Sequence, residues 1–358
     1  MSQTSPAPSP PAARRSAYDF SFDELAALLS DELPYRARQV WDGLHRRAMR
    51  PAEMTDLPLE LRARLDAALP AAFTEAARRE ADGGDTVKWL FELGDGLGVE
   101  TVLMTYPDRV TVCVSTQAGC AMGCAFCATG QAGFGRHLSP GEIVEQVVAA
   151  MRASRPRRLS NVVFMGMGEP LANYDRTWGA VERIHSDLGI SARRLTVSTV
   201  GIVPGILRLA HERLPVNLAV SLHAANDALR DRLVPINRRY PLSTLAEACD
   251  EYVGATGRRL SLEWALIDGT NDRPADMAEL AAFARPLGAH VNLIPLNPTP
   301  GYPVRGSSPR RVAGAREELE RLGVNATVRS TRGVEIDAAC GQLAARAAGP
   351  VVGALRVR

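Results

Sequence analysis

The stretch CVSTQAGCAMGCAFCATG, residues 113–130, holds four of the six cysteines in the 358-residue chain. Three of them, Cys120, Cys124 and Cys127, follow the spacing C-x3-C-x2-C on a loop directly after an apolar, β-branched run. Thiolates at this spacing can converge on one soft metal centre. Three cysteines on a four-iron cluster leave one iron open for a substrate, so we expect a 4Fe–4S cluster here. Two alternatives remain: a zinc site completed by a distant histidine, and unligated core cysteines.

The sequence around this loop predicts an α/β fold. Near-continuous apolar strands are expected at residues 110–116, 161–168, 194–201, 216–224, 259–267 and 290–298, with helical patterns between them. One helix begins after Ser139, where Pro140 and Glu142 complete a capping box, and another ends at Gly323. Such alternation indicates a parallel sheet buried on both sides. Six units are too few for a closed eight-stranded barrel, so we expect a partial (β/α)6 barrel with ligands at the carboxyl ends of its strands.

The remaining segments divide the chain further. Residues 1–17 are rich in Pro, Ala and Ser, lack the apolar stretch of a signal peptide, and are expected to be a disordered tail. Residues 18–81 carry apolar residues at helical spacing and predict a small all-helical N-terminal domain. Residues 82–108 predict a β-rich connector with turns at GDG and YPD. The catalytic core is then expected at 109–345, followed by a C-terminal tail at 346–358.

Composition limits the possible environments and partners. The hydrophobic fraction of 46% is ordinary for a globular protein, and there is no apolar run of about 18 residues to span a bilayer. We therefore expect a soluble cytoplasmic protein, where clustered cysteines serve metal binding or redox chemistry rather than structural disulfides. A net charge of +2 permits a nucleic-acid partner without requiring one.

The cysteine loop, together with GMGEP at residues 166–170, resembles the radical S-adenosylmethionine (SAM) superfamily. The resemblance implies that the three cysteines hold a 4Fe–4S cluster whose open iron chelates the amino and carboxylate groups of SAM. An electron from the cluster then splits SAM to a 5′-deoxyadenosyl radical. The GMGEP segment matches the one that receives the methionyl amino group, and glycines there would let a ligand approach the backbone closely.

Longer motifs narrow the resemblance to one family. VCVSTQAGCAMGCAFCATGQAGF, RLTVSTVGIVPGI, LAVSLHAANDALRDRLVPINRRYPL and TRGVEIDAACGQL resemble the RlmN family, and the resemblance runs from about residue 18 to 346. It implies methylation of adenosine C2 in 23S ribosomal RNA, in the peptidyl-transferase region, and in tRNA, at the adenosine 3′ of the anticodon. It also implies an electron donor such as flavodoxin, and we expect a monomer.

The family's chemistry gives the other cysteines roles. Adenine C2 has no nucleophilic lone pair, so it cannot attack a sulfonium methyl group and a carbon radical is needed. The resemblance implies that Cys340, in DAACGQL, takes a methyl group from one SAM, and that a second SAM provides the radical that activates it. Cys113 then resolves the thioether-linked intermediate through a transient disulfide with Cys340. Glu100, in GVETVLM, matches the general base that removes a proton from the adenine adduct.

The resemblance also implies contacts with SAM near the ends of the predicted strands, at Gly168, Glu169, Ser198, Ser221, Leu222, His223 and Asn297. Cys249 has no partner motif and is expected in the core. Basic stretches at residues 36–50, 152–158 and 230–240 are candidate RNA contacts, and each is equally compatible with a solvated surface. All cationic side chains but one are arginine, and the single lysine is Lys88.

Two competing interpretations remain. The related Cfr enzymes methylate adenine C8 by the same two-cysteine chemistry, and motifs do not decide between C2 and C8. A non-catalytic iron–sulfur or zinc RNA-binding protein would have no need of both Cys113 and Cys340.

Overall fold

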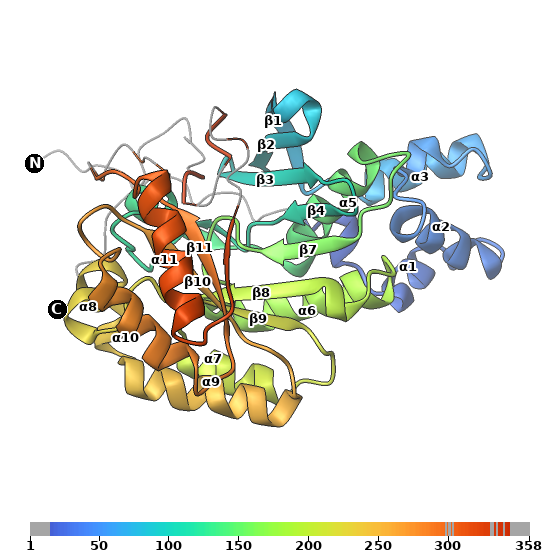
Figure 1. The fold of residues 1–358 in the computed structure, drawn as a ribbon. Coiled ribbons are helices and arrows are strands. Elements are labelled where there is room, and N and C mark those ends of the chain that lie inside the picture. The colour runs from blue at the N-terminus through green and yellow to red at the C-terminus, as the bar shows by residue number, and fades with distance from the viewer. Residues whose placement is uncertain are drawn as a thin grey trace, which may run out of the picture.

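The computed structural model describes residues 15–297, 299, 302, 304–329, 333, 336–338 and 341–343, and it is built around a 10-stranded sheet (Figure 1). In spatial order the strands are β1 (Phe73–Ala81), β2 (Thr86–Leu93), β3 (Gly98–Thr105), β4 (Val110–Cys113), β7 (Asn161–Phe164), β8 (Leu195–Thr199), β9 (Asn217–Ser221), β10 (Ser261–Leu266), β11 (His290–Pro295) and β12 (Ala326–Val328). A separate two-stranded sheet pairs β5 (Gln117–Gly119) with β6 (Phe134–His137).

The sheet changes direction at β4. From β4 through β12 every neighbouring pair is parallel, whereas β1, β2 and β3 add to the other side of β4 as antiparallel strands. The six predicted parallel strands are confirmed, and the short β12 adds one that the sequence did not reveal. The predicted paired strands at 82–108 are confirmed as β2 and β3, but they continue the same sheet as the barrel strands.

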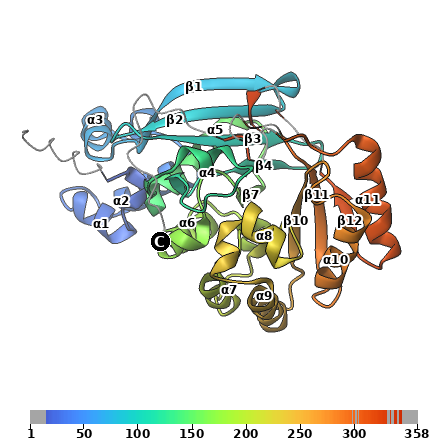
Figure 2. The same cartoon turned by 90° about the vertical axis from the view of Figure 1, so that its left-hand side faces the viewer.

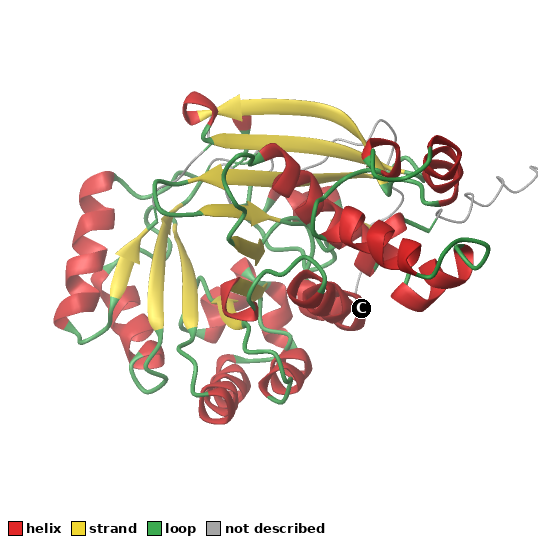
Figure 3. Ribbon diagram, turned by 90° about the vertical axis from the view of Figure 1, so that its right-hand side faces the viewer, coloured by secondary structure: helices red, strands yellow, loops and turns green. Residues whose placement is uncertain are grey.

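Helices connect the parallel strands and pack along the outer side of the curved sheet (Figures 2 and 3). They are α5 (Pro140–Ala153), α6 (Tyr174–Ser186), α7 (Val203–Ala210), α9 (Leu242–Thr256), α10 (Pro274–Ala284) and α11 (Pro309–Arg321). The short helix α8 (Asp227–Leu233) instead packs against the cysteine loop, where the Ala125 amide donates to the Leu233 carbonyl at 3.1 Å. The predicted capping box of α5 is present, because the Glu142 amide donates to Ser139 Oγ at 3.1 Å and the Ser139 amide donates to Glu142 Oε2 at 2.8 Å. The partial α/β barrel is therefore confirmed.

Short elements complete the architecture. The helix α4 (Ala128–Ala132) follows the cysteine loop. Single 3-10 turns occur at η1 (Ala17–Asp19), η2 (Pro51–Glu53), η3 (Asp82–Gly84), η4 (Pro170–Asn173), η5 (Ala192–Arg194) and η6 (Pro235–Arg238). No helix among the described residues is long and apolar enough to cross a membrane.

The N-terminal helices α1 (Phe22–Leu28), α2 (Tyr35–His45) and α3 (Leu59–Ala68) lie beside α5 and α6 (Figure 1). Polar contacts join the two groups: Arg183 Nη1 donates to the Phe20 carbonyl at 2.8 Å, and Arg152 Nη1 donates to Glu53 Oε2 at 2.9 Å. The predicted helical unit is thus confirmed as far as α3.

The prediction of helix up to residue 81 is wrong for Phe73–Ala81, which forms β1. The segment FTEAARREA is rich in Ala, Glu and Arg, which are good helix formers. However, β1 pairs with β2 along its length and lies at the edge of the sheet, with nearly all its residues exposed. Charged residues on an edge strand protect it from pairing with other chains, so tertiary pairing overrides the local helical preference.

Candidate active site

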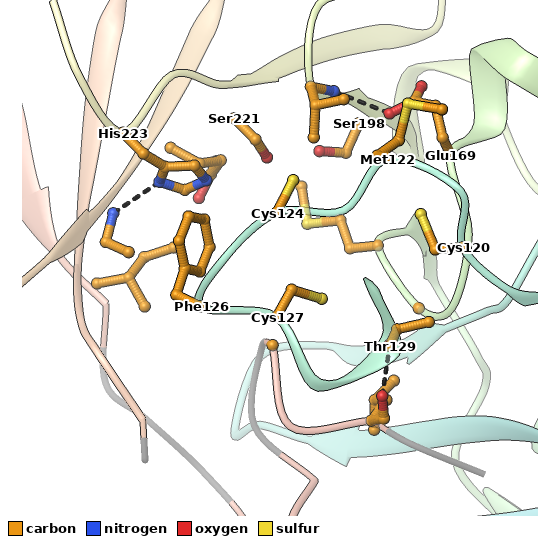
Figure 4. A pocket seen from close by; sticks show the side chains of 18 of the residues that line it. Cys120, Met122, Cys124, Phe126, Cys127, Thr129, Glu169, Ser198, Ser221 and His223 are labelled. Atoms are coloured by element: carbon orange, nitrogen blue, oxygen red, sulfur yellow. Dashed lines mark hydrogen bonds between the residues drawn. The ribbon is translucent and has the colours of Figure 1, made fainter. Parts of the chain in front are cut away.

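A cavity at the carboxyl ends of the parallel strands is lined by all three cysteines of the motif (Figure 4). Cys120, Cys124 and Cys127 point into the same space from the loop between β5 and α4. Opposite them lie residues from the ends of β7, β8, β9, β10 and β11. The structure therefore places the predicted cluster loop at the edge of the sheet where open α/β folds bind their ligands.

The cysteine loop is closed by the small β5–β6 sheet. The Cys120 amide donates to the Gly133 carbonyl at 2.7 Å, which joins the two ends of the loop. Gly119, with a φ of +82°, lies so near that a Cβ atom on it would approach the Gly133 oxygen to 2.1 Å. Only glycine fits this crossing. The hairpin thus fixes where the three thiols enter the cavity.

Burial favours the protonated thiol at Cys120 and at Cys124. It raises the pKa of Cys120 to about 12 and that of Cys124 well above its usual range. Within the described parts of the chain, no three His, Cys, Asp or Glu side chains are arranged to hold a single metal ion. A four-iron cluster makes a different demand, since each cysteine sulfur binds a different iron. Three thiols around one cavity fit that demand.

Glu169 lies deep in the same cavity, at the end of the GMGEP segment. Its carboxylate accepts hydrogen bonds from the Val200 amide at 2.9 Å and the Leu171 amide at 3.0 Å. Burial nevertheless raises the pKa of Glu169 to about 7, and it forms no salt bridge with any residue that the structure describes. A buried carboxylate of this kind is suited to pair with a cationic group of a ligand.

Most of the predicted SAM contacts come together in this cavity. Six of the seven line it, namely Gly168, Glu169, Ser198, Ser221, His223 and Asn297. Leu222 does not, because its side chain is buried in the core, and its amide donates to the Glu263 carbonyl of β10 at 3.0 Å.

His223 has a defined tautomer and orientation. Its Nδ1 atom accepts a hydrogen bond from the Ala265 amide at 2.9 Å, which leaves the proton on Nε2. Burial lowers the pKa of His223 to about 3, so the ring is neutral. The residue also has a φ of +59°, which is uncommon for a non-glycine residue and is often found at functional sites. His223 is therefore held as a neutral hydrogen-bond donor at the cavity.

Arg230 fixes the strand ends that carry Ser198 and Ser221, although it does not line the cavity. This fully buried side chain donates from Nη2 to the Val200 carbonyl at 2.7 Å and from Nε to the Leu222 carbonyl at 3.1 Å. Its Nη1 donates to Asn237 Oδ1 at 2.8 Å. Arg230 begins one of the basic stretches considered for RNA contact, but its burial shows that it acts inside the protein.

Arg230→Met should lower the free energy of unfolding by roughly 2–6 kcal/mol, because the Val200 carbonyl and Asn237 Oδ1 lose this buried donor at about 1–3 kcal/mol each. Arg232→Met is the matched control, since Arg232 is exposed on the same helix, and it should change stability by less than about 0.5 kcal/mol. Urea unfolding followed by circular dichroism measures both. Equal midpoints for the two variants would contradict the role given to Arg230.

The other basic stretches also serve the fold at several positions. Arg155 donates to the Arg47 carbonyl, and Arg157 Nη2 donates to the Tyr106 carbonyl at 2.6 Å. Arg158 Nη2 donates to the Gly189 carbonyl at 3.1 Å. These arginines bind backbone carbonyls of the protein itself, so RNA contact by these stretches stays a prediction.

Cys113 and Glu100 lie outside the cavity lining, on one face of the sheet beside it. Directly opposed residues on paired strands share a face, and Val102 is opposite Cys113. Glu100, two residues before Val102, is on the same face. Cys113 packs in a small apolar cluster with Val102, Met167 and Leu343, and Ala338 borders it.

The C-terminal segment connects this face to the cysteine loop. The Ala128 amide donates to the Gly341 carbonyl at 2.8 Å, and Thr129 Oγ1 donates to the Leu343 carbonyl. Gly341 and Leu343 both line the cavity. Cys340, the predicted methyl carrier, lies outside the described residues, but Gly341 follows it directly in the chain. The described residues around it therefore reach both Cys113 and the cluster loop.

Cys249 is confirmed as a core residue. It is fully buried on α9 within the main apolar cluster, and burial raises the pKa of its thiol to about 12.

Sequence reasoning missed Glu263 and Arg329, which both line the cavity. Glu263 Oε1 accepts a hydrogen bond from Asn292 Nδ2 at 2.8 Å, while its Oε2 lies 3.6 Å from Arg329 Nη1. Burial raises the pKa of Glu263. A carboxylate between the apolar residues Leu262 and Trp264 of the predicted strand at 259–267 is the signal that could have identified it.

Comparisons with known proteins agree with these observations. Residues 114–281 match the family model described as the radical SAM superfamily. The chain is 52% identical over 357 residues to "Probable dual-specificity RNA methyltransferase RlmN" from Chloroflexus aurantiacus, covering 94% of this chain and 95% of that protein. It is 54% identical over 349 residues to a protein of the same name from Parafrankia sp., covering 91% of each. The crystal structure of a radical SAM methyltransferase from Sphaerobacter thermophilus has a TM-score of 0.90 at 51% identity, covering 93% of this chain and 100% of that one.

Proposed function

The chain belongs to the RlmN family of radical SAM RNA methyltransferases, and from this membership we propose that it methylates adenosine C2 in both 23S ribosomal RNA and tRNA. The expected positions are the peptidyl-transferase region of the ribosomal RNA and the adenosine 3′ of the anticodon in tRNA. Membership also implies a 4Fe–4S cluster and SAM. The observation that carries the proposal is the C-terminal segment, which is bonded to the cysteine loop and packed against Cys113.

In this proposal Cys120, Cys124 and Cys127 hold the cluster. When bound, the cluster would supply the electron that splits SAM to a 5′-deoxyadenosyl radical. Glu169 would pair with the ammonium group of SAM, because it is a buried carboxylate without a salt bridge in the described part of the chain. Gly168 has a φ of +101°, and a Cβ atom on it would meet Gln117 at 2.6 Å, so only glycine fits at this point of the cavity wall.

Cys340 would carry the methyl group that is transferred, using one SAM for its methylation and a second for its activation. Glu100 would accept the proton that leaves the adenine adduct, and the cluster, when bound, would take up the electron that the adduct radical loses with it. The Cys113 thiolate would then attack the Cys340 sulfur. The sulfur–sulfur bond forms as the sulfur–carbon bond breaks, and the electron pair stays with the carbon, which takes a proton and becomes the methyl group. A cytosolic dithiol reductant would restore the two thiols.

RNA would approach from the side of the sheet that carries Cys113. The target adenine must leave its stack to reach a cavity at the strand ends, at a cost of a few kcal/mol. We assign the N-terminal helices α1 to α3 to RNA binding, and an electron donor such as flavodoxin to cluster reduction.

The test is nucleoside mass spectrometry on unmodified 23S ribosomal RNA and tRNA after incubation with the reduced, cluster-loaded enzyme and SAM. We expect 2-methyladenosine in both RNAs. Exclusive 8-methyladenosine would contradict the proposal in favour of Cfr-like chemistry. Cys340→Ala should keep the cluster and give no methylated base, whereas Cys249→Ala, a substitution in the core, should still methylate.

A further inference from the structure

Lys88 is the only lysine in a chain with 42 lysine and arginine residues, and it is buried. Its ammonium group lies 3.1 Å from Glu100 Oε1, with both side chains less than 10% exposed. The same nitrogen donates to the Asp337 carbonyl at 3.1 Å. One ammonium therefore joins the expected general base to the segment that leads to Cys340.

The sheet register places these groups on one face. Lys88 is opposite Val102, and Val102 is opposite Cys113, so the three residues form a row across β2, β3 and β4. Glu100 is on the same face because it is two residues from Val102 on β3. Lys88, Glu100 and Cys113 therefore face the same side of the sheet.

The C-terminal segment covers this face at two points. Gly333 lies against Thr86 of β2, since a Cβ atom on it would approach Thr86 Cγ2 to 2.9 Å. Leu343 packs against Val102 and Cys113. Asp337, whose carbonyl Lys88 binds, lies between these points in the sequence.

We propose that Lys88 is a positioning residue that holds the Glu100 carboxylate ionised and aligns it with the C-terminal segment. The inference rests on the proposed function, in which Glu100 is the base. A nearby ammonium favours the ionised carboxylate, which is the form that accepts a proton, and burial strengthens the effect. In this role Lys88 takes no part in the proton transfer, and the proton of the adduct moves only to Glu100.

Lysine suits this position better than arginine. Its compact ammonium directs tetrahedral donors, so it can reach a carboxylate and a carbonyl at the same distance from one atom. A guanidinium is larger and planar, and it would have to displace the C-terminal segment from the sheet. This explains why the one lysine stands here in a chain that otherwise uses arginine.

The experiment compares Lys88→Met, Glu100→Gln and the double variant in methylation by the cluster-loaded enzyme. Removing a general base costs about 10²–10⁴-fold in rate. Lys88→Met should lose at least about 10²-fold, and the double variant should be within about twofold of Glu100→Gln, since both act on one step. Losses that multiply in the double variant would overturn the inference.

A second readout follows the covalent protein–RNA adduct on denaturing gels. Lys88→Met should keep its cluster absorbance, form S-methyl Cys340 and accumulate the adduct. The impaired step is proton removal by Glu100, which follows radical addition. Lys88→Arg should accumulate it as well. Arg79→Met is the control, since Arg79 is opposite Lys88 on β1 but exposed, and it should leave no persistent adduct.

The outcomes distinguish failure of the proposed function from failure of the inference about Lys88. A wild-type enzyme that makes no methyladenosine would refute the proposed function. A wild-type enzyme that methylates RNA, together with Lys88→Met or Lys88→Arg at the wild-type rate, would refute the inference alone. Loss of S-methyl Cys340 in Lys88→Met would also refute it, because Lys88 would then only anchor the C-terminal segment.

Discussion

Replacing Cys124 by alanine should remove the iron–sulfur cluster and abolish cleavage of SAM. Cys124 is buried and lines the cavity together with Cys120 and Cys127, and each of the three would bind a different iron. Losing one ligand leaves an iron without protein support in a site that already reserves one iron for SAM. The same result is expected for alanine at Cys120 or Cys127.

The measurements are iron and sulfide content, visible absorbance after anaerobic reconstitution, and 5′-deoxyadenosine formed under reducing conditions. Cys249→Ala is the matched control, because it removes a buried thiol from α9 without touching the loop, and it should keep both cluster and activity. A Cys124→Ala protein with a full four-iron cluster and SAM turnover would contradict the assignment. Stoichiometric zinc in the wild-type protein would favour the alternative of a zinc site.

Cys113→Ala should start the reaction and fail to finish it. If Cys113 resolves the thioether, radical addition still occurs, and the enzyme stays bound to RNA through Cys340. A slowly migrating, nuclease-sensitive species should accumulate on denaturing gels, with product reduced to a single incomplete turnover. If Cys113 were only a packing residue, Cys113→Ala would lower the free energy of unfolding by only about 1 kcal/mol and would leave turnover unchanged.

Two comparisons make this result specific. The variant with both Cys113→Ala and Cys340→Ala should form no adduct, since the methyl carrier is gone. Val102→Ala removes an apolar side chain from the same small cluster and should weaken packing without trapping RNA. Normal methylated product from Cys113→Ala, without an adduct, would make Cys113 a packing residue.

The sequence correctly predicts those helices and strands whose signals are carried by a few adjacent residues. The capping box at Ser139 marks the start of α5, and the apolar runs mark six parallel strands, because both signals depend on a few adjacent residues. The prediction of helix is wrong for β1 because its Ala, Glu and Arg residues favour helix, while its conformation is set by pairing with β2.

The candidate site shows the same limit. The cysteine spacing identifies the loop, and family motifs identify most of the cavity lining. They do not reveal that Lys88 contacts Glu100, because the pair depends on the register between β2 and β3. Arg230 was read as a surface cation because a charge in a basic stretch carries no sign of burial. Its contacts with Val200 and Leu222 exist only once β8 and β9 are side by side.

The hydrogen bonds between the cysteine loop and the C-terminal segment can form only late in the synthesis of the chain. Thr129 and Leu343 are 214 positions apart, so a ribosome working at about 5–20 residues per second makes the second roughly 10–40 s after the first. By the time Val328 of β12 is made, every strand of the sheet and the whole cysteine loop already exist. The nascent barrel therefore passes through a stage in which Ala128 and Thr129 lack their C-terminal partners and the cavity lacks Gly341 and Leu343. Gly341 and Leu343 thus close a site whose other lining residues have already been made.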